Sequence, residues 1–422
     1  MPTGARPERT MTGTVFCTIA ARNYLAQARV LAASLACHHP GRRLVVVVVD
    51  GTGEEADDDR NRLFDLVGLE EIGLDRQELH LRAMIYDVVE FSTSIKPWLL
   101  EHLLDRGAET VVYVDPDIEL YAPIDDLIEL AGTHDLVLTP STTAPVPYDG
   151  LSPHESDFLR TGLFNLGFVI VAQQSRPFLR WWMPRLRRDC VRDEAAGYFV
   201  DQRWLDLAPF YFRAAVVCDP GCNVAWWNLA QRGAGRDAAG PTVGGAPLRF
   251  FHFSSFDPRR PATICTLPLV RPLRYHLSEF PPVAELCTQY VGRLLAAGHE
   301  QAATVRYGFD TGALGLPIDR RMRRIYREAL ADAEREKRPH GLPDPFDVVG
   351  AARFDAWLKQ PAPLDVPVWR YLQAVYDERL DLQVAFGALA GTGREAFLAW
   401  VRAGGMTDPA VSPELLRGLP DA

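Results

Sequence analysis

VVYVDPDIELY, at residues 111–121, is the stretch on which the fold prediction rests. It begins as an apolar, largely β-branched run that is typical of a buried strand, and it continues into two carboxylates, Asp115 and Asp117. Successive side chains of a strand point to opposite faces, so carboxylates spaced i, i+2 are expected on one face. Pro116 has no backbone N–H, so regular pairing should stop there and the strand should open toward a cleft.

Two carboxylates at the end of a core strand are typical ligands of a hard divalent cation, which can in turn hold a diphosphate. The alternative is an Asp-Pro-Asp turn that only ends the strand. The apolar run before the pair, together with the polar elements described below, favours the cation site.

A parallel sheet is predicted by the segments that precede this strand. Residues 14–20 and 44–49 are short apolar runs, and residues 23–36 between them carry apolar side chains at a helical spacing. Asn23 is placed to cap that helix. Strand, helix and strand in this order form a βαβ unit, so we expect an α/β protein with a mainly parallel, Rossmann-like central sheet.

The rest of the chain predicts a long loop, a mobile segment and a helical region. Residues 141–161 are rich in Pro, Ser, Thr and Asp, which predicts a surface loop, and residues 231–245 are rich in Gly and Ala. After about residue 272 the pattern becomes helical. We expect three parts: a disordered lead at residues 1–12, an α/β catalytic domain at 13–271 and a helical domain at 272–422.

The composition excludes several classes of protein. With 47% hydrophobic and 24% charged residues over 422 positions, the chain can bury a large core. Its net charge of -10 disfavours binding to nucleic acid. The seven cysteines are scattered without zinc-type spacing, which is typical of reduced thiols. No apolar run reaches the length of about 20 residues that a membrane span needs, and the first residues are polar, so we expect a cytoplasmic protein.

Further polar elements could complete a site around the carboxylate pair. His252 stands near the end of the predicted strand at residues 249–253 and is a candidate third ligand, and a site of oxygens with one imidazole suits Mn²⁺ or Mg²⁺. Asn165 and Gly167 open a buried strand, where a glycine permits close approach of a ligand. The structural alternatives are a core histidine and a capped strand start.

Two charged elements complete the predicted site. Asp201 and Gln202 open a predicted helix at residues 201–207, where Asp201 could instead serve only as an N-cap. Lys96 lies at a helix start before the carboxylate strand, and a cation beside a positive helix end is unfavourable unless an anion lies between them. The alternative for Lys96 is a solvated side chain.

The order of these elements resembles that of the GT-A fold glycosyltransferases, and most closely family 8, the group of glycogenin and the bacterial lipopolysaccharide galactosyltransferases. Members share an Asp-x-Asp strand end, an Asn-x-Gly strand, an Asp-Gln pair and a histidine after a strand, and the resemblance spans residues 14–258. Lys96 stands where the family has arginine, His252 is followed by FSSFDP instead of the family's Gly and Lys-Pro-Trp, and a helical C-terminal region is added. These departures indicate a divergent bacterial member.

The resemblance implies a metal-dependent transfer of a sugar from a nucleotide-diphosphate sugar to an acceptor, with retention of anomeric configuration. A cation on Asp115, Asp117 and His252 would neutralise the departing diphosphate, and Lys96 would add positive charge. The resemblance further implies that the Asp201 and Gln202 pair lies by the anomeric carbon. It also implies that Asn165 holds sugar hydroxyls.

Other ligand contacts follow from the predicted sheet. Ligands of open parallel sheets bind at the carboxyl ends of the strands, so the nucleobase and ribose are expected near Thr18, Ala20, Tyr24 and Asp50. The acceptor is expected near residues 141–161 and near Trp226, Trp227 and Asn228, because aromatic faces suit sugar rings. Adjacent tryptophans are, however, more often part of a core than of a sugar platform.

Two other functions remain open at this point. A sugar nucleotidyltransferase uses a similar sheet and metal but needs a Gly-rich, basic loop after the first strand, which residues 17–23 lack. A non-catalytic binding or scaffold protein with a transferase fold is the other possibility, and the intact polar elements argue against it. The sequence does not name the donor sugar, the oligomeric state or the acceptor, whether glycan, lipid-linked or small molecule.

Overall fold

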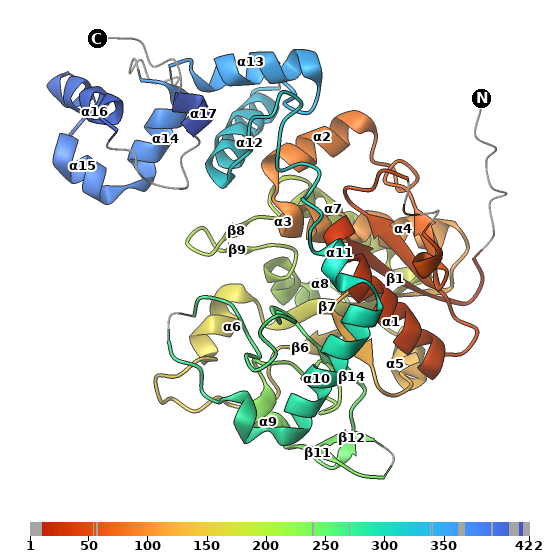
Figure 1. Cartoon of the computed structure of the whole chain (residues 1–422). Helices are drawn as coiled ribbons and strands as arrows, with labels where there is room; N and C mark the ends of the chain where they lie inside the picture. The colour runs from red at the N-terminus through yellow and green to blue at the C-terminus, as the bar shows by residue number, and fades with distance from the viewer. Residues whose placement is uncertain are drawn as a thin grey trace. The chain divides into compact units, whose positions relative to one another are not determined.

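The computed structural model describes residues 11–53, 55, 58–238, 240–269, 271–337, 339, 341–361, 368–389, 391–404 and 413–416. The predicted disordered lead therefore falls, for residues 1–10, outside the described residues. Contacts divide the chain into two compact units (Figure 1), of which the first is Met1–Asp75 with Val88–Arg306 and the second is Arg76–Asp87 with Tyr307–Ala422. The domain boundary expected at residue 272 differs from this division and stays a prediction.

The first unit is built on a seven-stranded sheet with the strand order β10-β6-β7-β4-β1-β2-β3. These strands are β1 (Thr14–Ala20), β2 (Leu44–Val48), β3 (Phe64–Val67), β4 (Thr110–Val114), β6 (Leu136–Pro140), β7 (Phe164–Ala172) and β10 (Ala214–Val216). Neighbouring strands are parallel except at β7, which runs antiparallel to both β4 and β6. All of β2 is buried, as expected for a strand covered on both faces. The predicted α/β class with a mainly parallel sheet is confirmed.

Ten α-helices are described in the first unit. They are α1 (Leu25–His38), α3 (Val88–Ser94), α4 (Lys96–Asp105), α5 (Asp125–Leu130), α6 (Glu155–Thr161), α7 (Arg176–Arg188), α8 (Ala208–Tyr211), α9 (Leu229–Arg232), α10 (Pro281–Ala296) and α11 (His299–Ala302). Helix α10 packs on α1 (Figure 1), so a segment beyond residue 272 belongs to the same unit as the central sheet.

Four segments differ in secondary structure from what the sequence pattern indicated. The helix expected to start at Asn23 starts at Leu25, because residues 22–24 form a 3-10 turn and Tyr24 holds the capping position. The helix expected at 201–207 is a 3-10 turn, Arg203–Leu207. The loop expected at 141–161 contains α6. The mobile segment expected at 231–245 contains the hairpin of β11 (Ala234–Arg236) and β12 (Pro241–Val243).

Two short strands lie outside the central sheet and place the predicted histidine. Strand β5 (Ile118–Leu120) pairs antiparallel with β14 (Phe250–His252), and His252 stands opposite Ile118. Side chains alternate along β14, so Phe250 stacks on Phe168 in the core at 4.8 Å between ring centroids, while Phe251 and Phe253 share the other face at 4.6 Å. The pairing brings residue 252 beside the carboxylate turn that precedes β5.

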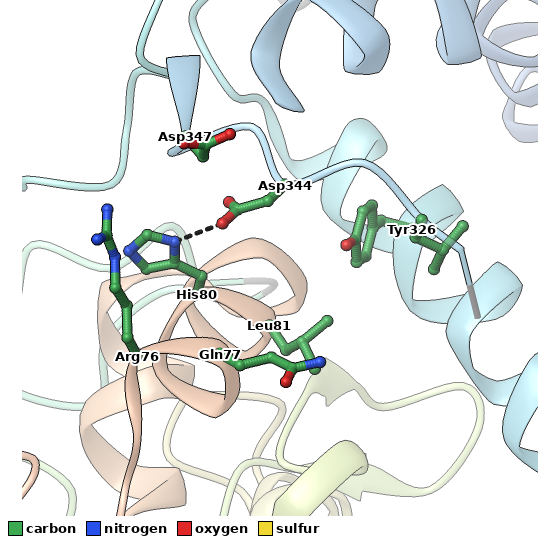
Figure 2. Close-up of a pocket in the computed structure, with 8 residues that line it drawn as sticks. Arg76, Gln77, His80, Leu81, Tyr326, Asp344 and Asp347 are labelled. Carbon is green, nitrogen blue, oxygen red and sulfur yellow. Dashed lines mark hydrogen bonds and ion pairs between the residues drawn. The ribbon is translucent and has the colours of Figure 1, made fainter. Parts of the chain in front are cut away.

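The second unit is helical in its described residues. It consists of α2 (Arg76–Ile85), α12 (Arg320–Arg335), α13 (Val348–Leu358), α14 (Arg370–Glu378), α15 (Leu380–Phe386), α16 (Thr392–Arg402) and α17 (Pro413–Leu416). Its cavity of about 440 Å³ is shown in Figure 2, where His80 Nδ1 lies 2.6 Å from Asp344 Oδ2. Among the described residues of the whole chain, no helix has both the length and the apolar character of a membrane span.

Candidate active site

Three predicted metal ligands meet at the carboxyl end of β4. One ligand atom from each of Asp115, Asp117 and His252 lies within 4.8 Å of the others. His252 Nε2 is 3.1 Å from Asp117 Oδ1 and 3.9 Å from Asp115 Oδ2. Strand β4 ends at Val114, and residues 115–118 form a turn in which the Ile118 N–H donates to the Asp115 carbonyl at 3.0 Å. The turn alternative is therefore correct for the backbone, and this turn is what brings the carboxylates together.

The donor set of this cluster fits a divalent cation. Two carboxylates and one imidazole supply hard oxygen ligands with a single nitrogen, the combination that Mn²⁺ and Mg²⁺ accept. Burial lowers the pKa of His252, but the carboxylates of Asp117 and Asp115 outweigh it and raise that pKa above its usual value. A proton on His252 would offset one of the two carboxylate charges, and a bound cation would take the place of that proton.

Residue 167 must be glycine because the His252 ring occupies the space of a side chain. A Cβ at this position would lie 2.6 Å from His252 Cε1 and 2.9 Å from Asn165 Oδ1. The close approach predicted at Gly167 is therefore made by a side chain of the chain itself. Asn165 Oδ1 accepts from the Gly167 N–H at 3.2 Å and lies 3.1 Å from His252 Nδ1. This contact orients the ring so that Nε2 faces the two carboxylates.

Gln202 anchors Asn165 in turn. Gln202 Oε1 accepts from Asn165 Nδ2 and from the Leu166 N–H, both at 3.3 Å, and Gln202 Nε2 donates to the Thr161 carbonyl at 2.9 Å. Val200 precedes this pair with φ of 42°, a conformation that is strained for a β-branched residue. Such strain is held by surrounding contacts and occurs most often at functional sites.

Lys96 is buried and links the predicted site residues. Its Nζ lies 2.8 Å from Asp201 Oδ2 and 3.6 Å from Asp115 Oδ1, and it donates to the Leu166 carbonyl at 2.7 Å. The solvated alternative for Lys96 is wrong, since its side chain is only 1% exposed. Burial lowers the Lys96 pKa, but Asp115 and Asp201 reverse this and raise it. Burial raises the pKa of Asp201 to about 6, against the opposing effect of Lys96.

The predicted nucleotide contacts lie along β1 and the turn after it. Thr18 and Ala20 are buried, and Tyr24 is 38% exposed. The Tyr24 pKa is raised by burial and then by the charges of Asp117 and Asp115, so its hydroxyl lies on the side of the carboxylates. Asp50 Oδ1 accepts from the Arg22 N–H at 2.8 Å and so closes the βα turn. Nucleotide binding by these residues stays a prediction.

The tryptophan pair supports the histidine. Trp227 is 8% exposed and packs edge-to-face on the His252 ring at 5.4 Å, and Trp226 packs the same way on Trp227 at 5.8 Å. Asn228 is buried, accepts from the Ala225 N–H at 3.0 Å and donates to the Asn223 carbonyl at 2.9 Å. These contacts hold the segment together, and acceptor binding by it stays a prediction.

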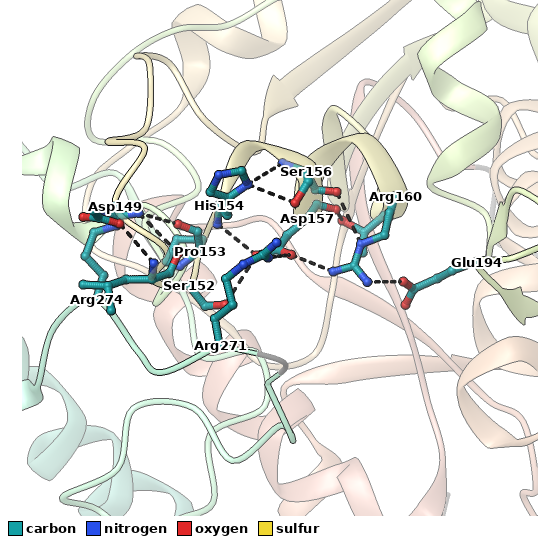
Figure 3. A network of polar contacts seen from close by, with 12 residues as sticks. Asp149, Ser152, Pro153, His154, Ser156, Asp157, Arg160, Glu194, Arg271 and Arg274 are labelled. Carbon is teal, nitrogen blue, oxygen red and sulfur yellow. Dashed lines mark hydrogen bonds and ion pairs between the residues drawn. The ribbon is translucent and has the colours of Figure 1, made fainter.

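The loop around α6 is held by a polar network (Figure 3). Arg274 is paired with Asp149 and donates to three loop carbonyls, including that of Pro153 at 2.9 Å. Asp157 pairs with Arg160 at 2.6 Å and with Arg271 at 3.4 Å. Arg160 also pairs with Glu194 at 3.2 Å. The predicted acceptor loop is thus a fixed wall of the first unit.

Sequence reasoning missed a buried group on the other side of the turn. Glu119 is 5% exposed and lies with its Oε1 2.7 Å from Arg293 Nε, while its Oε2 accepts from Tyr121 at 2.8 Å. Tyr290 lies in the same core cluster as Phe253. The i, i+2 spacing of Asp117 and Glu119 was a signal in the sequence, but nothing local connects it with α10.

Comparison with known proteins finds limited similarity. No family model matches the chain. The uncharacterised protein YfnD of Bacillus subtilis (strain 168) is 27% identical over 176 residues, which make up 40% of this chain and 54% of that protein. The match thus spans about half the length of that relative.

Several solved structures of glycosyltransferases are similar to part of this chain at low TM-scores. The galactosyltransferase LgtC, solved in complex with donor and acceptor sugar analogs, is 16% identical, with 66% of this chain and 95% of that chain covered and a TM-score of 0.37. Mouse xyloside xylosyltransferase 1 is 14% identical, with 57% and 98% covered and a TM-score of 0.36. GlyE of Streptococcus pneumoniae TIGR4 is 17% identical, with 49% and 46% covered and a TM-score of 0.32. These values are low, and the functional proposal rests on the site geometry instead.

Proposed function

We propose that this chain is a metal-dependent glycosyltransferase that moves a sugar from a nucleotide-diphosphate sugar to an acceptor with retention of anomeric configuration. The observation that carries the proposal is the meeting of Asp115, Asp117 and His252 at the carboxyl end of a core strand, with ligand atoms within 4.8 Å of one another. Ligands of open parallel sheets bind at this edge. A cytoplasmic location is part of the same proposal.

The metal ligands are held ready by the protein itself. When bound, a divalent cation supplies positive charge to the leaving diphosphate and so stabilises the charge that develops as the sugar–phosphate bond breaks. Asn165 fixes the His252 ring, and Gly167 leaves room for it. Trp227 closes one side of the ring and lowers the access of water. A preorganised ligand set of this kind is what catalysis by charge stabilisation requires.

Lys96 and Asp201 have different roles near the donor: Lys96 balances charge, and Asp201 positions the sugar. The single charge of Lys96 lies between the carboxylates of Asp115 and Asp201 and offsets part of their combined negative charge. Asp201 is 1% exposed and paired at 2.8 Å, which supports a positioning role by the sugar over a role as attacking group. Asn165 and Gln202 form the neighbouring amide wall, which is suited to sugar hydroxyls.

Hydrolysis of a panel of nucleotide-diphosphate sugars, without acceptor, tests the proposal. The full chain is incubated with Mn²⁺, with Mg²⁺ or with chelator, and release of nucleoside diphosphate is measured. We expect turnover of at least one donor that depends on the metal. Release of pyrophosphate from a nucleoside triphosphate and a sugar phosphate would instead indicate a nucleotidyltransferase. Absence of both turnover and donor binding would favour a scaffold protein.

A further inference from the structure

Helix α10 presents two side chains to the segment that carries the metal ligands. Tyr290 and Arg293 are three residues apart and therefore share one face of the helix. Arg293 lies 2.7 Å from Glu119 Oε1 through Nε and donates to Glu119 Oε2 through Nη2 at 2.8 Å. Glu119 is two residues beyond Asp117. This ion pair fixes the position of α10 along β5.

Tyr290 is held rigidly beside the carboxylate turn. It is 2% exposed, and its ring stacks on Phe253 with 3.8 Å between centroids and an interplanar angle of 4°. The Phe253 N–H donates to the carbonyl of Asp117 at 2.9 Å. The phenol is thus fixed relative to the backbone of the metal ligand itself.

The Tyr290 hydroxyl is buried and, among the described residues, has no hydrogen-bond partner. An unpaired buried hydroxyl destabilises the folded state, and each such group in a native structure calls for an explanation. Burial raises the pKa of Tyr290 well above its usual value, and among the charged groups Asp117 contributes most to that rise, followed by Glu119. Glu119 already has Arg293 and Tyr121 as partners. Because Tyr290 stacks on Phe253, whose backbone is hydrogen-bonded to Asp117, Asp117 is the candidate acceptor for this hydroxyl.

We propose that Tyr290 is a positioning residue for Asp117 and donates a hydrogen bond to its carboxylate when a divalent cation is bound. The inference rests on the proposed function, since it needs a cation at Asp115, Asp117 and His252. His252 Nε2 lies 3.1 Å from Asp117 Oδ1. If His252 held a cation through that nitrogen, Asp117 would no longer have the imidazole as a hydrogen-bond partner and could accept from another donor. Hydrogen bonds to ligating carboxylates orient them and tune metal affinity.

The test is Mn²⁺ binding to the Tyr290→Phe variant by isothermal titration calorimetry, without nucleotide. Phenylalanine keeps the ring that stacks on Phe253 and removes only the hydroxyl. We expect the Mn²⁺ dissociation constant to rise roughly tenfold. The melting temperature of the metal-free variant should stay unchanged or increase, because an unpaired buried hydroxyl is removed. A merely structural role would not move the Mn²⁺ affinity.

Tyr121→Phe is the matched control, because the Tyr121 hydroxyl donates to Glu119 at 2.8 Å. It should lower the melting temperature and leave Mn²⁺ affinity unchanged. Wild-type protein that binds no Mn²⁺ would overturn the proposed function itself. Wild-type protein that binds Mn²⁺ with the same affinity as Tyr290→Phe would overturn this inference alone, and so would an equal loss of affinity in Tyr121→Phe.

Discussion

Two ion pairs, each with a buried carboxylate, lie near the carboxylate turn, and they differ in whether they also contact its aspartates. In the first pair, Lys96 lies 2.8 Å from Asp201 and also 3.6 Å from Asp115, so its single charge serves both its partner and the candidate metal site. In the second pair, Arg293 contacts both oxygens of Glu119. The first pair is therefore part of the electrostatics of the site.

The second pair is complete without the site. Glu119 receives a third contact from Tyr121, and the Arg293 side chain remains 38% exposed. Arginine suits this task because its planar fork matches a carboxylate, whereas lysine is a point charge that can be divided between acceptors. An ion pair in this unit can therefore balance the charge of the candidate site, or it can hold a helix in place. Mutations of Lys96 and Arg293 should distinguish these two roles.

Lys96→Met should have the largest effect, because it leaves Asp201 buried without a compensating charge. Removal of one partner of a buried pair costs about 3–5 kcal/mol, and both side chains here are almost fully buried. We expect a loss of that size in the free energy of unfolding in urea at pH 7. Donor turnover should fall as well.

The double variant Lys96→Met with Asp201→Asn is the reference for this prediction. It leaves no unpaired charge at either position, so most of the lost stability should return while turnover stays low. A double variant no more stable than Lys96→Met would show that the lysine acts through packing rather than through charge.

Asp117→Asn should have the second-largest effect, and it acts on the candidate metal site that Lys96 also contacts. The amide keeps the shape of the side chain but removes the negative charge that a divalent cation needs. Metal-dependent donor hydrolysis should fall by roughly 100-fold or more, with little change in melting temperature. Asp65→Asn is the matched control, since the Asp65 side chain is 47% exposed and pairs with Arg43 on the surface at 3.0 Å. Near-normal turnover in Asp117→Asn would remove the metal assignment.

Local features of the fold and the site could be predicted from the sequence, whereas contacts between distant segments could not. Strands β1, β2 and β4 were predicted because buried strands leave continuous β-branched runs, and the metal ligands because strand ends and polar motifs are local patterns. Helix α6 was missed because its start rests on a capping box made by His154 and Asp157 inside a stretch of loop-like composition. Arg293 was missed because its partner Glu119 lies 174 residues away in the sequence, and Tyr290 because it stacks on Phe253 of another element. No local pattern records such contacts.

The pH dependence of stability should change when Asp201 is replaced. Burial raises the Asp201 pKa to about 6 in the folded protein, above the value of about 3.9 in an unfolded chain. The folded state therefore holds this proton more tightly, and the resulting stabilisation, complete at low pH, is lost as pH rises through 6. Asn cannot ionise, so from pH 4 to pH 7 Asp201→Asn should gain about 2 kcal/mol relative to wild type. A constant difference in unfolding free energy over this range would show that Lys96 keeps the carboxylate ionised.

Arg293→Met should have the smallest effect, and it tests whether the Arg293 and Glu119 pair acts only in holding α10. Glu119 would lose its cation, but the Arg293 side chain is 38% exposed, so this pair should contribute less than the almost fully buried pair of Lys96 and Asp201. The hydrogen bond from Tyr121 to Glu119 remains. We expect a loss of about 1 kcal/mol in unfolding free energy. Metal-dependent turnover should be retained, because Tyr290 stays fixed by its stacking on Phe253. If turnover fell as far as in Lys96→Met, both pairs would belong to the charge of the site, and the distinction between a site pair and a docking pair would be lost.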